Sequence, residues 1–303
     1  MKTLAVVVLS WNGAKLTRET LDSLAACRVP AGWRAHVLVV DNASSDGSPA
    51  MLARDYPAVE LMALAENRRF AGGNNAGLER ALAAGADAVM LLNNDVQADP
   101  ALYEKLLGAL AEDPRAGAAA PLIYHAAPTS LIWYAGGRCH LGTAHTSHVG
   151  LRQRDRGQFR SVETTGYLTG CCLLATAAAW RAVGMLDERY FIYAEDADWS
   201  LRARAAGFRL LFVPTARLWH QVSASSGGAV NPWKIYQRLR ANLRLFGRHA
   251  RGFARLTWLP AFLAQQAVLW TVLAARGNFA AAFAIPRALW DALTGKDPAE
   301  VKA

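Results

Sequence analysis

Three carboxylates fall within one short stretch of the sequence, at Glu195, Asp196 and Asp198, and aromatic residues flank them. Like charges this close repel one another, and partial burial adds to the cost unless a cation, a metal ion or a proton neutralises them. A carboxylate in such a group has a raised pKa, which makes it a better general base than a free aspartate. The same residues also suit the first turn of a helix, where Asp198 can pair with Arg202 one turn later. The stretch thus predicts either an acid–base centre or an ordinary helix start.

Polar residues also recur at the ends of three apolar runs, where they could bind a ligand together. They are Ser10 and Asn12 after 4–9, Asp41 after 36–40, and Asn93, Asn94 and Asp95 after 88–92. In a parallel sheet, ligands bind beyond the carboxyl ends of the strands. Any one of these residues alone would be an ordinary turn residue, but their recurrence predicts a nucleotide-type pocket.

The elements that must position these residues alternate between strands and helices. We predict strands at 4–9, 36–40, 59–64, 88–92, 167–175, 208–213 and 216–219, and helices at 16–26, 74–84, 101–112, 177–183 and 196–206. This order predicts an α/β fold with a Rossmann-like, mostly parallel sheet and helices on both faces. Residues 121–165 are weakly patterned, and we expect a short antiparallel excursion or a loop over the site. The domain would span residues 1–228.

Several single residues have a binding interpretation beside a structural one. Asp41 could accept hydrogen bonds from a base or ribose, although Asp41–Gly47 also encodes an Asx turn. Asp95 could hold a divalent ion that also takes diphosphate oxygens. His220 could complete that site. A lone histidine, however, is usually structural.

The glycine-rich stretch 70–77 opens a helix after a strand, as a dinucleotide-binding fingerprint does. It does not follow the first strand, and Asn74 stands where the second glycine is needed, so NAD or FAD binding is rejected. Arg69 and Asn74 remain candidates for contacting a nucleotide. The alternative is a capped helix entry.

Composition narrows the compartment and the partners. The four cysteines have no CxxC spacing and two are adjacent, which fits a reducing cytosol rather than a disulfide framework. The apolar N-terminal run ends at Trp11 without a small-residue cleavage site, so we interpret it as a buried strand and not a signal peptide. Residues 231–303 hold 11 of the 33 Lys/Arg but only 3 of the 24 Asp/Glu. The net charge of +9 therefore indicates an anionic surface met by the tail, and not a nucleic-acid-binding protein.

The C-terminal region, 229–303, is predicted to be helical and to associate with a membrane. A helix at 233–257 would carry apolar residues on one stripe and Arg244, Arg248, Arg251 and Arg255 on another, which suits an anionic surface. Residues 256–275 have near spanning length, but Pro260 and two glutamines favour a helix that lies in the interface. Residues 279–293 predict another apolar helix. The alternative is a helix packed on the catalytic domain with a solvated face.

Taken together, these stretches resemble the inverting family 2 glycosyltransferases, in particular the rhamnosyltransferase-like branch with a GT-A fold. The matching stretches run in the family's order at 6–12, 39–48, 67–77, 91–96, 168–174, 186–202 and 219–226. The resemblance implies that Asp41 contacts the nucleotide, that Asp196 is the catalytic base, and that His220 contacts metal or diphosphate. Asp95 would be the metal-binding aspartate of a DxD-type motif. Here that motif reads Asn93-Asn94-Asp95, so a Mg²⁺ or Mn²⁺ site would have a single carboxylate.

The remaining site residues follow from the same comparison. Ser10, Asn12 and Asn94 would help to bind the nucleotide sugar. Glu195 would tune the base. Gly170, Asp198 and Arg202 would position the acceptor.

The resemblance suggests deoxythymidine-diphosphate rhamnose as donor and a lipid-linked saccharide or polysaccharide of the cell envelope as acceptor. The enzyme would then work at the cytoplasmic face of the cell membrane. Two alternatives stay open. A sugar-nucleotide nucleotidyltransferase would need a Gly- and Lys/Arg-rich loop after the first strand, which Ser10–Lys15 matches poorly. A non-catalytic membrane scaffold would not need the carboxylates.

Overall fold

The apolar runs near the N-terminus form four parallel strands on one side of the main sheet. They are β1 (Lys2–Ser10), β2 (Trp33–Asp41), β3 (Glu60–Ala63) and β4 (Ala88–Asn93). β1 pairs in parallel with both β2 and β4, and β2 pairs in parallel with β3. The computed structural model describes residues 1–126, 129–221 and 230–297.

Further strands extend this sheet beyond β4 in the order β10-β12-β6-β11-β4-β1-β2-β3. The added strands are β6 (Ala116–His125), β10 (Glu163–Thr164), β11 (Cys172–Thr176) and β12 (Arg209–His220), with β5 (Val96–Ala98) on β12 and β7 (Ile132–Tyr134) on β6. β11 runs antiparallel to β4 and β6, whereas β12 runs parallel to β6. The sheet is therefore mixed, and the strands β4, β1, β2 and β3 form a continuous parallel half of it, in agreement with the predicted Rossmann-like α/β sheet.

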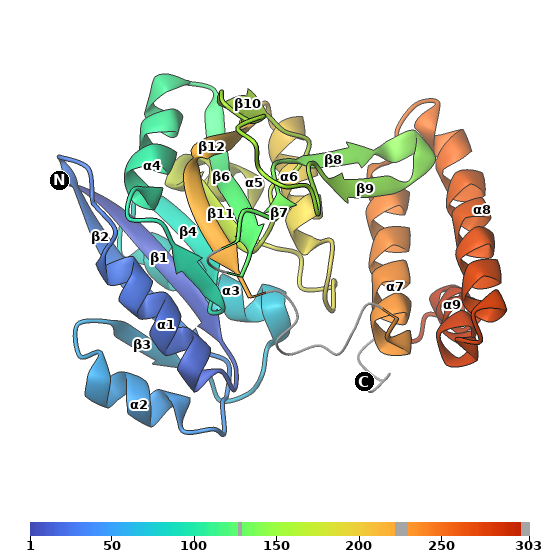
Figure 1. Ribbon diagram of the computed structural model, residues 1–303, viewed down its shortest axis with the longest axis horizontal. Helices are drawn as coiled ribbons and strands as arrows, with labels where there is room; N and C mark the ends of the chain where they lie inside the picture. Colours follow the sequence, from blue (N-terminus) through green and yellow to red (C-terminus); the bar gives the residue numbers. More distant parts are fainter. Residues whose placement is uncertain (127–128, 222–229, 298–303) are drawn as a thin grey trace.

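Helices cover both faces of the sheet (Figure 1). They are α1 (Ala14–Ala25), α2 (Ser48–Asp55), α3 (Arg69–Ala83), α4 (Leu102–Glu112), α5 (Ala177–Val183) and α6 (Glu195–Ala205). α1 and α4 lie on one face, and Arg28, in the loop after α1, forms an ion pair with Glu104 of α4. α5 and α6 lie on the other face with α3, and Trp180 packs against Trp199 with ring centroids 4.4 Å apart. The α/β prediction is confirmed.

The glycines at the start of α3 serve close packing on the sheet. A Cβ atom on Gly77 would lie 2.4 Å from Val7 Cγ1 of β1 and 2.8 Å from Val40 Cγ2 of β2. A Cβ atom on Gly73 would lie 2.5 Å from a methyl group of Leu9. These glycines let the helix backbone approach the strands, which explains the glycine-rich stretch without a pyrophosphate-binding role.

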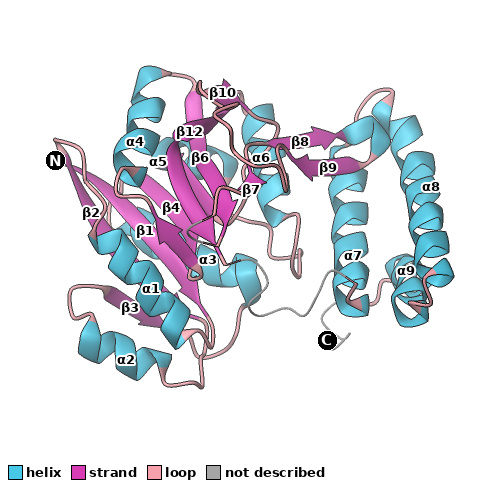
Figure 2. Cartoon of the chain, in the orientation of Figure 1, coloured by secondary structure: helices cyan, strands magenta, loops and turns pink. Residues whose placement is uncertain are grey.

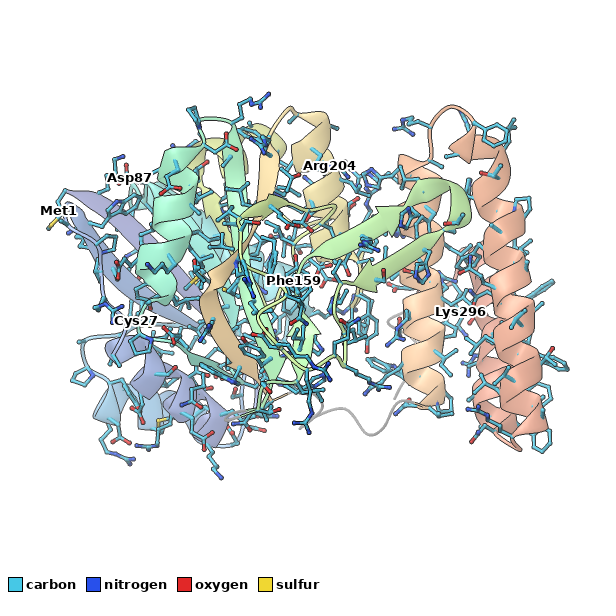
Figure 3. The ribbon with its side chains drawn as sticks, turned by 45° about the horizontal axis from the view of Figure 1, so that its top comes forward. Met1, Cys27, Asp87, Phe159, Arg204 and Lys296 are labelled. Carbon is cyan, nitrogen blue, oxygen red and sulfur yellow. The ribbon has the colours of Figure 1, made fainter. Side chains whose placement is uncertain are left out.

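The weakly patterned middle of the chain holds more structure than the sequence indicated. β6 includes the first part of it, and β8 (Gly137–His140) and β9 (His145–His148) form a hairpin around a short 3₁₀ turn at Leu141–Thr143. The segment 150–162 is held to the sheet by Phe159, which is labelled in Figure 3. Its ring packs edge-on against that of Phe212 in β12. The predicted strands 208–213 and 216–219 are one strand, β12, with a register shift between Val213 and Arg217.

The C-terminal region forms three helices beside the α/β unit (Figures 1 and 2). They are α7 (Pro232–His249), α8 (Ala254–Ala275) and α9 (Phe279–Leu293). The side chain of Asn231 caps α7 by accepting hydrogen bonds from the backbone of Trp233 and Lys234. The β8–β9 hairpin reaches across to α8, where Gln265 donates to the carbonyl of Thr143. The predicted boundary at 228/229 falls outside the described residues.

The single helix predicted at 233–257 is wrong. α7 ends at His249, and Ala250 is extended before Gly252 adopts a left-handed φ of +50°. The arginines of the predicted stripe therefore do not share one face. Arg248 turns toward the α/β unit and pairs with Asp187 and Asp198.

Large apolar side chains remain exposed on α8 and α9. They are Leu256, Leu259, Leu263, Val268, Leu269, Trp270 and Val272 on α8, and Phe279, Phe283, Trp290 and Leu293 on α9. By length and composition α8 could cross a membrane, and only 11% of its apolar window is buried in the protein. α8 packs against α9, and the number of large apolar side chains exposed on these two helices exceeds the ordinary scatter of single apolar residues.

Candidate active site

The strand ends that the sequence singled out lie next to one another. In the register of the sheet Ser10 is paired with Asp41, and Leu9 is paired with Asn93. The backbone of Asn93 also donates to the carbonyl of Cys171, which adjoins the start of β11. One edge of the sheet therefore collects the ends of β1, β2 and β4 together with residues 169–171.

Asp41 is almost completely buried at this edge. Its Oδ2 atom accepts a hydrogen bond from the backbone of Ser44, while Oδ1 has no hydrogen-bond partner among the described residues. The predicted Asx-type turn is therefore present, and it uses only one of the two carboxylate oxygens of Asp41. A buried acceptor without a partner costs free energy, so this oxygen suits an N–H or O–H group of a ligand.

Asn12, Ser10 and Asn94 are largely engaged within the protein. Asn12 has a left-handed φ of +48°, and its Oδ1 accepts from the backbone of Ser45 at 2.8 Å. The side chain of Asn94 donates to Thr17 Oγ1 at 2.9 Å and lies 3.3 Å from Ser10 Oγ. These contacts tie the loops at the strand ends to one another and, through Thr17, to α1.

The α3 candidates separate into an exposed arginine and buried asparagines. Arg69 has a φ of +62°, and its guanidinium lies 4.3 Å from the ring centroid of Phe191. Asn74 is 1% exposed and donates to the carbonyl of Phe70 within its own helix. The neighbouring Asn75 binds the backbone of Leu186 with both its amide atoms. Only Arg69 of this group presents a free polar head to solvent.

Asp95 and His220 meet, as their proposed shared role requires. Asp95 Oδ1 lies 3.1 Å from His220 Nε2, but the groups are not aligned as a hydrogen bond. Neither this oxygen nor His220 Nδ1 has a hydrogen-bond partner in the described parts of the chain. His220 lies at the end of β12 opposite Val96 of β5, which follows Asp95 directly. Trp133 stands edge-on to the imidazole with centroids 4.7 Å apart.

This donor pair fits a divalent cation. A separation of about 3 Å is that of adjacent ligands around an ion with bonds of about 2.1 Å. One carboxylate oxygen and one imidazole nitrogen suit Mn²⁺ better than Mg²⁺, and they leave coordination positions for phosphate oxygens and water. In the described chain no group of three or more His, Cys, Asp or Glu side chains gathers as a metal site, so the protein would supply only part of a coordination shell.

Asp196 and Glu195 open α6 after a strained loop. Tyr193 and Ala194 both have left-handed φ values, +72° and +67°, which non-glycine residues rarely adopt. Asp196 Oδ2 accepts from the backbone of Gly170 at 2.8 Å, and Oδ1 accepts from Ala197 at 2.7 Å. The contact with Gly170 is what brings α6 to the edge of the sheet. A larger residue at position 170 would require the ring of Phe70 to shift, because a Cβ atom there would lie 3.0 Å from Phe70 Cζ.

Burial dominates the electrostatics of these two acids. It raises the pKa of Asp196 above its ordinary value, although hydrogen bonds from Gly170 and Ala197 oppose the shift. Burial also raises the pKa of Glu195, and the charge of Asp196 raises it further. Glu195 Oε2 has no hydrogen-bond partner among the residues described. The pair thus holds a proton more tightly than free carboxylic acids do.

Asp198 and Arg202 have a different environment from Asp196. Asp198 is fully buried and contacts Arg202 Nε at 2.8 Å, Arg248 Nη1 at 3.1 Å and His249 Nε2 at 2.7 Å. Although burial opposes it, hydrogen bonds from His249 and Arg202 hold the pKa of Asp198 below its usual range. The guanidinium of Arg202 is occupied by its ion pair with Asp198 and by hydrogen bonds that it donates to the backbone carbonyls of Val183 and Met185. Any positioning by Asp198 and Arg202 therefore acts through α7 and the segment before α6.

The candidate residues gather around Cys171. This thiol is buried, and burial raises its pKa most, followed by the charge of Asp95, whereas Cys172 and Asp196 raise it less. The structure thus places Asp41, Asp95, His220, Gly170 and Asp196 at one edge of the sheet. Sequence reasoning missed two features that no local pattern marks. One is Trp133, edge-on to His220, and the other is the contact of Arg248 and His249 with Asp198, which we call the clamp. The matching Ser223–Ser226 stretch lies outside the described residues.

Comparison with known proteins identifies the family. The sequence model of Glycosyl transferase family 2 matches residues 5–182, which include the ends of β1, β2 and β4. The chain belongs to glycosyltransferase family 2. The prediction from the sequence motifs is thereby confirmed, and the nucleotidyltransferase and scaffold alternatives are set aside. Asp196 and His220 of this glycosyltransferase lie beyond the matched segment.

A curated relative of known activity is similar over the catalytic unit. The chain is 32% identical over 208 residues to an N-acetylglucosaminyl-diphospho-decaprenol L-rhamnosyltransferase of Mycobacterium tuberculosis. The match covers 63% of this glycosyltransferase and 68% of the relative.

Solved structures of low sequence identity share the fold. A mannosyltransferase of Pyrobaculum calidifontis, in complex with GDP-Man and Mn²⁺, superposes with a TM-score of 0.59 at 18% identity. The superposition covers 97% of this chain and 87% of the mannosyltransferase chain. GalNAc-T7 with UDP, GalNAc and Mn²⁺ gives a TM-score of 0.61 at 17% identity over 81% of this chain, which spans 47% of that protein. These likenesses confirm the predicted GT-A fold.

Proposed function

We propose that this glycosyltransferase is inverting and metal-dependent, and that it moves rhamnose from a nucleoside diphosphate to a hydroxyl of a lipid-linked saccharide in cell-envelope glycan synthesis. The observation that carries the proposal is the position of Asp196. Its carboxylate has a raised pKa and is held by Gly170 at the same edge as the unpartnered oxygen of Asp41 and the Asp95–His220 pair. The choice of sugar and acceptor rests on the mycobacterial relative.

The donor would be bound by the strand ends. Asp41 Oδ1, buried and without a partner among the described residues, accepts a hydrogen bond from the nucleobase or ribose. Asp95 and His220 would hold the divalent cation, Mn²⁺ in preference to Mg²⁺, which when bound supplies positive charge to the leaving diphosphate. Arg69 would add an exposed cation, whose guanidinium lies over the ring of Phe191, to the residues that bind the donor.

Asp196 acts on the acceptor. A carboxylate whose pKa is raised by burial takes a proton from the acceptor hydroxyl more effectively than a solvated one. The hydroxyl oxygen then forms a bond to the anomeric carbon as the bond to the diphosphate breaks, so the configuration inverts. Glu195, buried beside the base, tunes its proton affinity. Asp198 does not take part directly, because its oxygens are occupied by Arg202, Arg248 and His249.

The C-terminal helices would bring the enzyme to its lipid-linked substrate. The exposed apolar residues of α8 and α9 suit burial in the interfacial region of a membrane, and the excess of basic residues in the region favours anionic lipids. The four free cysteines fit a reducing compartment, and this supports assigning the enzyme to the cytoplasmic face of the membrane.

A transfer assay tests the proposal. The full chain is incubated with labelled deoxythymidine-diphosphate rhamnose, other labelled nucleotide sugars, and N-acetylglucosaminyl-diphospho-polyprenol. We expect rhamnose in the lipid fraction, loss of the product with EDTA, and recovery with Mn²⁺. Transfer of another sugar would refute the donor, and full activity in EDTA would refute the metal. No transfer to lipid from any donor would refute the acceptor.

A further inference from the structure

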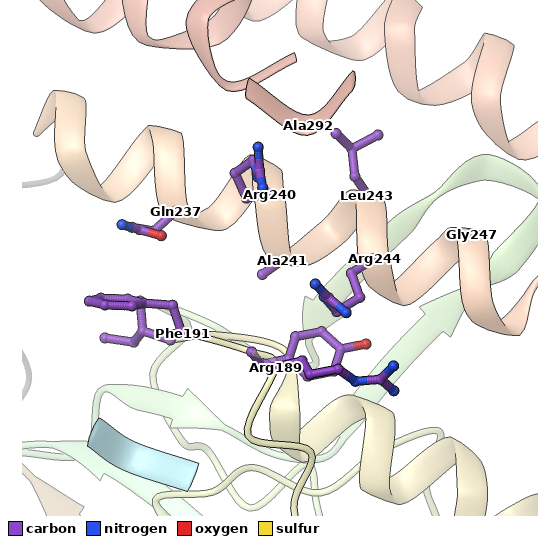
Figure 4. A pocket seen from close by; sticks show the side chains of 11 residues that line it. Arg189, Phe191, Gln237, Arg240, Ala241, Leu243, Arg244, Gly247 and Ala292 are labelled. Atoms are coloured by element: carbon purple, nitrogen blue, oxygen red, sulfur yellow. The ribbon is translucent and has the colours of Figure 1, made fainter. Parts of the chain in front are cut away.

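A cavity of about 390 Å³ separates the loop before α6 from the first of the C-terminal helices (Figure 4). The loop contributes Arg189, Tyr190 and Phe191, and α7 contributes Arg240 and Arg244. Ala292 of α9 lines the cavity as well. None of the strand-end residues or Asp196 lines it, so it is separate from the site that would hold the donor.

The cavity is built to receive an anion. Three arginines line it, and no acidic residue does among the residues that the structure describes. Arg240 donates through Nη2 to the carbonyl of Lys296, but its Nη1 atom is buried without a hydrogen-bond partner in the described chain. Arg244 is exposed, and its guanidinium lies 5.9 Å from the ring centroid of Tyr190. Guanidinium groups in such a cavity suit phosphate oxygens, which they bind with two parallel hydrogen bonds.

The cavity also lies between the two parts of the enzyme that a lipid-linked acceptor must reach. Ile192, which lines it, precedes Asp196 by four residues, so their Cα atoms are at most roughly 14 Å apart. On the other side, Ala292 sits on α9 between the exposed side chains of Trp290 and Leu293. A molecule bound here would therefore have the catalytic base at one end and the apolar surface at the other.

We propose that this arginine-lined cavity binds the diphosphate of the lipid-linked acceptor, with Arg240 and Arg244 as its principal ligands. The inference rests on the proposed function and adds to it the part of the enzyme that recognises the acceptor's phosphates. In this arrangement the lipid tail leaves over α9 and the sugar extends past Phe191 toward Asp196. Arg189 contributes less, because Asp187 already occupies its guanidinium with bonds of 2.6 to 3.1 Å.

The test uses the full chain with Arg240→Gln, Arg244→Gln and the double variant. Arg276→Gln serves as the matched control, because it removes the same charge from an exposed position of the same region outside the cavity. Binding of inorganic pyrophosphate is measured by calorimetry in EDTA with the donor site saturated by deoxythymidine diphosphate. The KM and kcat of transfer are measured with a soluble acceptor, N-acetylglucosamine carrying a citronellyl diphosphate.

We expect the double variant to bind pyrophosphate at least about tenfold more weakly and to raise the acceptor KM by a similar factor. The donor KM, kcat and the Arg276→Gln control should stay at wild-type values. Unchanged pyrophosphate binding and acceptor KM would overturn the inference. Arg244→Gln, at an exposed position, gives the answer alone should the double variant fail to fold.

An anionic lipid headgroup is the other source of phosphate, and sedimentation with vesicles of phosphatidylcholine, with and without phosphatidylglycerol, distinguishes it. If the double variant loses binding to anionic vesicles while its acceptor KM is unchanged, the cavity binds headgroups and the inference is wrong. The proposed function is tested separately. If pyrophosphate binding depends on the arginines but the wild type transfers no sugar, the anion site stands and the proposed function is refuted. If the wild type transfers sugar and the double variant does so with the same acceptor KM, the function stands and the anion site is refuted.

Discussion

Replacing Asp198 with Asn should destabilise the protein without removing a group that contacts substrate. The carboxylate is fully buried and compensates Arg202 and Arg248, with His249 as a third neighbour. Breaking a buried ion pair costs about 3–5 kcal/mol when the remaining charge is left uncompensated. Both arginines keep other partners here, because Arg202 binds two carbonyls and Arg248 binds Asp187 at 2.6 Å.

We therefore expect a loss of about 2–3 kcal/mol in the free energy of unfolding, and a Tm lowered by about 3–5 °C for a chain of this size. Thermal unfolding followed by circular dichroism at pH 7.5 measures it. The control is Asp55→Asn, which breaks ion pairs with Arg18 and Arg54, whose side chains are 44% and 71% exposed, and it should change the Tm little.

The same variant decides between two roles for Asp198. Through its contacts with Arg248 and His249 it docks α7 on the segment that leads to Asp196, so a loss of stability should accompany any rise in the acceptor KM. An Asp198→Asn protein that melts like the wild type would refute the clamp. A raised acceptor KM at unchanged stability would restore the expectation that Asp198 positions the acceptor itself.

Three further outcomes follow from packing, charge and exposure. Gly77→Ala should lower the free energy of unfolding by about 1–3 kcal/mol, because the added Cβ overpacks α3 against the sheet. Gly108→Ala is the control: its Cβ meets nothing within 4 Å, so it should raise the free energy of unfolding by about 0.5–1 kcal/mol. Denaturant titrations that show equal effects for the two variants would contradict the account of α3. Because the folded pKa of Glu195 is raised, its stabilising contribution is complete below its unfolded pKa of about 4.3 and is lost as pH rises. Glu195→Gln should therefore melt increasingly above the wild type from pH 5 to 8, and parallel Tm–pH curves would show that the group is not perturbed. Replacing Leu256 and Val268, 73% and 65% exposed, with Ser should reduce sedimentation with vesicles by about tenfold or more at unchanged Tm; undiminished binding would exclude α8 as the membrane contact.

Much of the α/β unit could be predicted because its strands are buried on both faces and so appear as uninterrupted apolar runs. The ends of those runs then located Asp41 and Asp95, since parallel strands must present their carboxyl ends at one edge. The pairing of Ser10 with Asp41 and of Leu9 with Asn93 shows how directly the sequence encodes this edge.

The remainder depends on contacts between distant parts of the chain, which a local pattern does not carry. β12 is one bulged strand because its two halves pair with the same strand, β6, and this partner is not visible in the sequence. α3 begins at Arg69, five residues before the predicted start, because a left-handed φ there turns the chain without any local signal. The sequence pattern predicts that Arg248 faces a membrane, whereas in the structure it forms ion pairs with Asp187 and Asp198.

The central claim is that Asp196 is the base and not a donor ligand. The most direct test compares Asp196→Asn with the wild type in two measurements, transfer to a lipid-linked acceptor and the Kd of the nucleotide sugar in the presence of Mn²⁺. We predict that transfer falls by about 10²- to 10⁴-fold while the donor Kd changes by no more than about twofold, the reach of an isosteric change that leaves the donor's own contacts in place. Loss of donor binding, or transfer that persists in the variant, would contradict the assignment.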